Sequence, residues 1–176
     1  MLPTMHLPLS GGRTNVLADI LRASAGIDFK DLNINMNTSP ETGLNGNAHL
    51  YALRMDSTRI DTIRLSLRDT PTGLSYQGQV TNNKRNPQIV FNALLDGRIY
   101  DQGASTGLRV YDADGKMGLR IGAYIAIEDN GLRFRLVPER PTLGYKQFAL
   151  NSDNFLFIRD DSRLQAKIDL IADDGT

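Results

Sequence analysis

The feature that most constrains this chain is a period-two alternation of apolar and polar residues from about residue 31 to near residue 170. It is cleanest over residues 119–127, where every second residue is apolar. Successive side chains of a β-strand point to opposite faces, so this period predicts strands with one apolar and one polar face. Short turns separate the strands, which favours antiparallel pairing of neighbours. No repeated βαβ pattern follows, which excludes a parallel doubly wound sheet.

The alternation predicts about nine or ten strands. The clearest segments are residues 32–36, 49–55, 63–67, 74–80, 89–95, 119–127, 132–136 and 164–170. Turn-forming residues predict a turn at 39–43, a polar loop at 82–87, a turn at Asp96-Gly97 and a hairpin turn at Asp129-Asn130-Gly131. Leu119 to Ile127 and Leu132 to Leu136 flank that last turn. We therefore expect Ile121, Ala123, Ile125 and Phe134 to share one face.

Residues 15–25 predict one short helix near the start of the chain. Thr14 or Asn15 is expected to cap its first turn, and Gly26 occupies the position where a left-handed residue ends a helix. Four apolar residues form a stripe at helical spacing, which supports the helix: Val16, Leu17, Ile20 and Leu21.

A Gly-Leu pair recurs five times, at residues 43–44, 73–74, 107–108, 118–119 and 131–132. Four of the five pairs stand where a strand is expected to start. A turn glycine followed by the first inward apolar side chain explains such pairs. A unit repeated along an elongated sheet is the alternative, but the spacing is too uneven for a strict solenoid.

Composition excludes several classes of function. The 176 residues are 40% apolar and 23% charged, which is typical of a folded domain, and the formal net charge is zero. Zero net charge disfavours nucleic-acid binding and polybasic membrane attachment. The chain has no cysteine and two histidines, His6 and His49, which argues against thiolate catalysis and zinc centres. We expect no enzyme activity, no cofactor and no metal, and no apolar run is long enough to span a bilayer.

Two motifs with catalytic or metal-binding associations have simpler explanations. Residues 103–107 match the Gly-x-Ser-x-Gly pattern, but that nucleophile turn needs a following helix, and here an apolar alternating segment follows. Asp112, Asp114 and Gly115 resemble the start of a calcium loop, but the closing glutamate is absent. We expect a small-residue loop at the first motif and a hairpin turn at the second.

The one-sided apolar strands leave two architectures open. In a β-sandwich, two sheets would bury their apolar faces against each other. In one elongated, curled antiparallel sheet, the apolar face would form a groove. The groove candidates are Ile89, Phe91, Leu95, Leu119, Ile121, Ala123, Ile125, Ile127, Leu132, Phe134, Leu136, Leu164, Ala166, Ile168 and Leu170.

Four stretches of running sequence carry a family resemblance. They are residues 43–50 (GLNGNAHL), 86–93 (NPQIVFNA), 140–146 (RPTLGYK) and 166–175 (AKIDLIADDG). Together they resemble an internal stretch of the TamB-like proteins of Bacteroidota, in the wider AsmA-like superfamily, over roughly residues 29–176. The resemblance rests on the running sequence and on the pattern of its strands, and not on a catalytic motif.

The resemblance implies a fold, a location and a role. It implies an all-β domain formed by a sheet folded lengthwise, a β-taco, with one short N-terminal helix. It implies residues 1–28 as an extended segment and helix, and residues 29–176 as a groove domain within a longer protein. That protein would be anchored in the inner membrane and cross the periplasm. It would carry phospholipid along the groove, support outer-membrane protein assembly, or do both, with a BamA-like barrel as partner. A scaffold for nascent outer-membrane β-strands and a purely structural sandwich are the alternatives.

Overall fold

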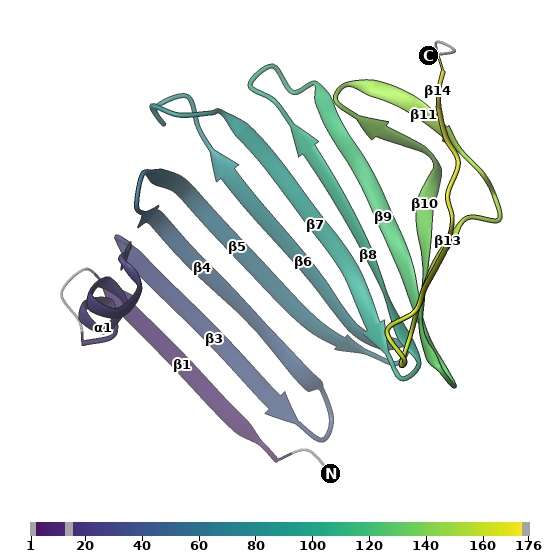
Figure 1. Cartoon of the computed structure of the whole chain (residues 1–176). Helices are drawn as coiled ribbons and strands as arrows, with labels where there is room; N and C mark the ends of the chain where they lie inside the picture. Colours follow the sequence, from purple (N-terminus) through teal and green to yellow (C-terminus); the bar gives the residue numbers. More distant parts are fainter. Residues whose placement is uncertain (1–2, 13–15, 174–176) are drawn as a thin grey trace. The chain divides into compact units, whose positions relative to one another are not determined.

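The computed structural model describes residues 3–12 and 16–173, and shows one open antiparallel sheet of 14 strands with one helix (Figure 1). The strands are β1 (Met5–Gly12), β2 (Ile27–Asp28), β3 (Asp31–Ser39), β4 (Gly43–Met55), β5 (Thr58–Thr70), β6 (Gly73–Asn82), β7 (Phe91–Tyr100), β8 (Gly103–Tyr111), β9 (Met117–Glu128), β10 (Gly131–Leu143), β11 (Lys146–Leu150), β12 (Phe155–Arg159), β13 (Leu164–Lys167) and β14 (Leu170–Ala172). The helix is α1 (Val16–Ala25). The all-β, antiparallel prediction with one short helix is therefore confirmed. The described strands do not divide into the two facing sheets of a sandwich.

Two compact units divide the chain, residues 1–93 and residues 94–176, with the boundary inside β7. In the N-terminal unit the strand order is β1-β3-β4-β5-β6, and β2 pairs with β4. In the C-terminal unit the order is β8-β9-β10-β11-β14, and β12 pairs with β10 and β13. The functional division at residues 28 and 29 stays a prediction of the resemblance.

Glycines begin several strands, as the recurring Gly-Leu pairs predict. Gly43, Gly73 and Gly131 open β4, β6 and β10 with φ of 64°, 117° and 155°, values that favour glycine. Gly118 is the second residue of β9. The exception is Gly107, which lies in the middle of β8.

The helix agrees with its predicted bounds. Gly26 has a φ of 64°, and its N–H donates to the carbonyl of Arg22, so the predicted left-handed end is confirmed. Among the described side chains of the helix, Ala18 is buried, whereas Val16 and Ile20 are exposed. The proposed caps Thr14 and Asn15, and the side chains of Leu17 and Leu21, lie outside the described part of the chain.

The turn predicted at Asp96-Gly97 is wrong, because both residues lie inside β7 and the turn comes at residues 101–102. The strand predicted over residues 164–170 is also wrong as one element. It divides into β13, which pairs with β12, and β14, which pairs with β11. Asn151 stabilises the chain between β13 and β14, where the pairing partner changes from β12 to β11. Its side-chain oxygen accepts from the N–H of Asp169, and its own N–H donates to the Asp169 carbonyl.

Asparagine side chains replace backbone partners at two places in the sheet. The Asn154 side chain accepts from the N–H of Leu136 at 2.7 Å and donates to the carbonyl of Leu136. The Asn82 side chain accepts from the N–H of Asp61 and donates to the carbonyl of Arg59. Both asparagines are buried, at 4% exposure, and each satisfies strand backbone groups that no neighbouring strand reaches there.

Candidate functional site

The strands of the C-terminal unit place their apolar side chains on one face, as their register shows. Directly opposed residues of antiparallel strands lie on the same face. Ile125 of β9 is opposite Ala104 of β8 and Phe134 of β10. Phe134 is opposite Leu156 of β12, which is opposite Ala166 of β13. The C-terminal apolar face consists of Ala104, Leu108, Val110, Leu119, Ile121, Ala123, Ile125, Ile127, Leu132, Phe134, Leu136, Leu156, Ile158, Leu164 and Ala166.

No member of this face is fully buried in the described part of the chain. Ile127 and Leu164 keep 60% and 63% of their surface exposed, and the remaining members are half-buried or exposed. The buried hydrophobic side chains of the described chain are Ala18, Phe29, Leu150, Phe157 and Ala172, and Pro141 is buried as well; none of them belongs to this face. Soluble proteins seldom expose a continuous apolar surface without a binding role. The C-terminal apolar face is therefore the candidate functional surface of this unit.

The opposite face of the same strands carries polar and charged side chains. The Arg133 guanidinium lies 4.9 Å from the ring centre of Phe155 and 4.8 Å from that of Phe157. It also donates to both carboxylate oxygens of Glu128. These contacts hold β12 against β10 from the polar side, so the two faces of the unit differ in chemistry.

The N-terminal unit has an apolar face built by the same rule. Leu50 of β4 is opposite Leu32 of β3 and Ile63 of β5, and Ile63 is opposite Val80 of β6. The N-terminal apolar face consists of Met5, Leu7, Leu9, Leu32, Ile34, Met36, Leu44, Ala48, Leu50, Ile63, Leu65, Leu67, Tyr76 and Val80. None of these side chains is buried in the described structure. The opposite face of β3 and β4 carries asparagines and a histidine.

The hairpin prediction is confirmed. Ala123 is opposite Leu136, Ile125 opposite Phe134 and Ile127 opposite Leu132, around a turn at residues 129–130. The structure thus brings together the candidates on β9, β10 and β13, although their binding role stays a prediction.

Five other candidates lie outside this group. Ile89 precedes β7 in a loop and is 66% exposed, so its predicted strand position is wrong. Ile168 lies between β13 and β14, again outside a strand. Phe91 falls in the N-terminal unit and Leu95 in the C-terminal unit, both on β7. Leu170 lies on β14, opposite the buried Leu150 of β11.

The candidate set from the sequence omitted Leu156 and Ile158 on β12. Their alternation is hidden because Phe155 and Phe157 fill the intervening positions, so the segment has no period-two contrast. The two phenylalanines contact Arg133 on the polar face, which makes an apolar residue suitable on both sides of this strand. Leu156 and Ile158 could have been found from the two phenylalanines between them, because aromatic side chains can pack against the arginines of a neighbouring strand such as β10.

The Gly-x-Ser-x-Gly match and the calcium-loop match lie in an ordinary strand and an ordinary turn. Residues 103–107 are all inside β8, so Ser105 does not stand on a strand-to-helix turn, and the expected loop is instead a strand. Asp112 forms the predicted turn, because its carboxylate accepts from the N–H groups of Asp114 and Lys116. These bonds, led by the one from Lys116, lower the pKa of Asp112 below its ordinary 3.8. Within residues 3–12 and 16–173, no group of three or more His, Asp or Glu side chains is placed to hold a metal ion.

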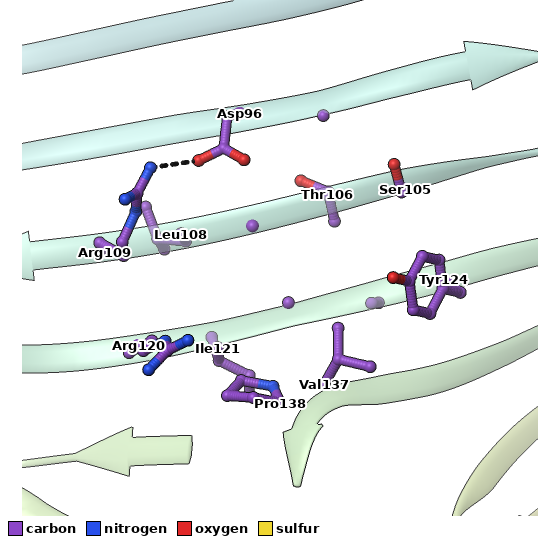
Figure 2. A pocket seen from close by; sticks show the side chains of 14 residues that line it. Asp96, Ser105, Thr106, Leu108, Arg109, Arg120, Ile121, Tyr124, Val137 and Pro138 are labelled. Carbon is purple, nitrogen blue, oxygen red and sulfur yellow. Dashed lines mark hydrogen bonds and ion pairs between the residues drawn. The ribbon is translucent and has the colours of Figure 1, made fainter. Parts of the chain in front are cut away.

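The polar face of the C-terminal unit contains a hollow of about 390 Å³ (Figure 2). Its floor is the cross-strand pair Gly107 and Gly122, and Arg109, Arg120 and Tyr124 stand around it. Its lining also includes Thr106, Leu108, Ile121 and Ala123, which alternate along β8 and β9 with the residues of the polar face.

Comparison with family models, with curated proteins and with solved structures gives no match to this chain. In the part of the chain that the structure describes, no helix has the length and apolar character needed to cross a membrane.

Proposed function

We propose that this chain is a non-enzymatic segment of a lipid conduit, in which acyl chains of phospholipids lie along the apolar faces of the sheet. The observation that supports it best is the C-terminal apolar face, which extends over β8, β9, β10, β12 and β13 without a cover. The periplasmic location, the anchor in the inner membrane and the BamA-like partner belong to the proposal through the family resemblance alone.

The chemistry of the face suits an acyl chain. An acyl chain offers only CH₂ and CH₃ groups, so it needs apolar contact and no fixed hydrogen bonds. Each CH₂ group removed from water contributes about 0.8 kcal/mol. The C-terminal apolar face presents Ile, Leu, Val, Ala and Phe side chains in consecutive rows, with no charged side chain among its members. A row of similar, shallow contacts permits movement along the face, whereas one deep pocket would hold the lipid in place.

Site-specific photocrosslinking tests the proposal. A photoreactive phenylalanine analogue replaces Ile125 on the apolar face or its neighbour Tyr124 on the polar face. Both versions are expressed in the full-length protein in its native cell. We expect phospholipid adducts by mass spectrometry at residue 125 and few at residue 124, because adjacent residues of β9 point to opposite faces. Equal labelling at both positions, or no lipid at position 125, would contradict the proposal.

A second candidate function is a scaffold that pairs with unfolded strands of outer-membrane proteins. One observation favours it: among the described residues, β1 is hydrogen-bonded to β3 alone, so its other backbone edge is open. An open edge can accept an incoming strand by β-augmentation. Crosslinking from Leu7 of β1 to an unfolded barrel protein, without lipid labelling at residue 125, would favour the scaffold over the conduit.

A further inference from the structure

The hollow on the polar face of the C-terminal unit exists because two opposed residues both lack a side chain. Gly107 of β8 is directly opposite Gly122 of β9. The next opposed pairs on the same face carry large or polar side chains, Arg109 with Arg120 on one side and Ser105 with Tyr124 on the other. The result is a depression of about 390 Å³ with walls of side chains and a floor of backbone (Figure 2).

Only one of the two glycines is required by packing. A Cβ atom on Gly122 would lie 2.4 Å from the carbonyl oxygen of Thr106, which is a collision with backbone. A Cβ atom on Gly107 would come no closer than 3.5 Å, to a carboxylate oxygen of Asp96, which is an ordinary contact. Glycine weakens a strand interior, and here the fold does not need it. The space above Gly107 is therefore open for a reason other than the packing of this chain.

The charges around the hollow are unbalanced by one positive charge. Arg109 and Arg120 are directly opposite on one face, where like charges repel. Arg109 is neutralised by Asp96, whose carboxylate oxygen lies 2.6 Å from its guanidinium nitrogen. Arg120 has no side-chain partner among the described residues. The Arg120 guanidinium group, with N–H donors that no described side chain uses, therefore lies beside the floor formed by Gly107 and Gly122.

The far end of the hollow offers different groups. Ser105 and Tyr124 lie four residues along the strands from the arginine pair, which is about 13 Å of backbone. Tyr124 supplies a hydroxyl group and an aromatic ring, and Val137 and Pro138 close one side with apolar surface. A matching ligand has an anionic group at Arg120 and an arm with hydroxyl groups that extends over the glycine floor toward Tyr124.

We propose that this hollow binds a phosphodiester that carries a polyol arm. A phosphodiester has one negative charge, which equals the excess positive charge of the hollow. Its two non-bridging oxygens fit the fork of a guanidinium group. Its organic arms explain why the hollow extends well beyond the arginine pair. The ligand is a soluble metabolite or the headgroup of a phospholipid. The arginines and Tyr124 that would recognise the ligand lie on the polar face, so this proposal does not depend on the proposed lipid conduit.

Amide-resolved NMR titration of the whole chain tests the proposal with three probes: glycerophosphoglycerol, dimethyl phosphate and glycerol. We expect saturable shifts centred on Gly107 and Gly122 with glycerophosphoglycerol, weaker binding of dimethyl phosphate and none of glycerol. Adding dihexanoyl phosphatidylglycerol below its micelle concentration separates the two sources. Tighter binding of the lipid than of glycerophosphoglycerol indicates a headgroup, and equal or weaker binding indicates a soluble ligand.

Three variants locate the site. Arg120→Gln removes the unpaired charge and should weaken binding by about tenfold or more. Gly107→Ala keeps every charge but raises the floor, and should weaken binding in a chain that folds normally. Arg98→Gln, on the exposed end of β7 outside the hollow, makes the same charge change and should bind as the parent does. Equal losses in Arg120→Gln and Arg98→Gln, acetate binding as tight as the phosphodiester, or shifts spread over all arginines would overturn the proposal.

Discussion

A charge placed at Ile125 distinguishes an uncovered apolar face from a covered one. Ile125 lies between Ala104 and Phe134 on the C-terminal apolar face and is half-buried. In the Ile125→Glu variant, a carboxylate on an uncovered face still reaches water. On a covered face, the same carboxylate is buried without a partner.

The two cases differ in magnitude. Burying an isoleucine side chain completely contributes about 1.5–3 kcal/mol, so Ile125, most of whose surface is buried, contributes roughly 1–2 kcal/mol. The lower strand preference of glutamate adds up to about 1 kcal/mol. The expected loss in the free energy of unfolding is about 2 kcal/mol, or about 4–8 °C in Tm for a chain of this size. A buried, unpaired carboxylate would cost several kcal/mol more and would unfold a marginally stable domain.

Urea denaturation followed by circular dichroism measures this difference. The matched control is Ala126→Glu, the next residue on β9, which points to the polar face opposite Arg133. We expect the control to change stability by no more than about 0.5 kcal/mol. In the photocrosslinking assay, Ile125→Glu with the probe at residue 127 should lower lipid capture, whereas Ala126→Glu should not. An unfolded Ile125→Glu chain beside a folded control would refute the uncovered face.

Three further predictions concern single residues. Gly122→Ala should lose about 1–3 kcal/mol of stability, because its new methyl group meets a backbone carbonyl at 2.4 Å, whereas Gly107→Ala should be close to neutral in the same urea titration. Asn154→Leu should destabilise by about 2–4 kcal/mol, because the buried N–H and carbonyl of Leu136 lose their partners, and Asn154→Asp should lie between it and the parent. The pKa of Asp112 is lowered, so its contribution is present above the unfolded pKa and disappears as the pH falls through the folded pKa. A ¹³C NMR titration should place the Asp112 carboxyl midpoint below 3.8, and a midpoint at or above that value would contradict the assigned hydrogen bonds.

The alternation of the sequence was sufficient to predict the strands and their faces wherever polar and apolar residues truly alternate. Residues 119–127 and 132–136 became opposed rows of β9 and β10, because the period and the turn between them together determine the register. The prediction failed at residues 164–170, where the alternation continues while the chain changes partners. That change depends on Asn151, which is distant in sequence and binds the backbone of Asp169.

Whether the apolar faces would be covered could not be predicted from periodicity. A sandwich and a single sheet require the same alternation, since each strand has one apolar face in both architectures. The hollow at Gly107 could not be predicted from the sequence either. A mid-strand glycine becomes informative only when the register places it opposite Gly122 and beside two arginines. The aromatic pair of β12 concealed its strand period for a comparable reason, since its partner Arg133 is more than twenty residues away.

The strands within each unit gain most of their contacts from the strands beside them, and few apolar side chains are fully enclosed. Stability in such an array is close to a sum of local terms between neighbours. A duplicated hairpin would carry its own alternation and turn residues, so it would need no matching change in a distant packed layer. The length of such a chain can therefore grow or shrink by whole hairpins during evolution, while the rules that fold each hairpin stay the same.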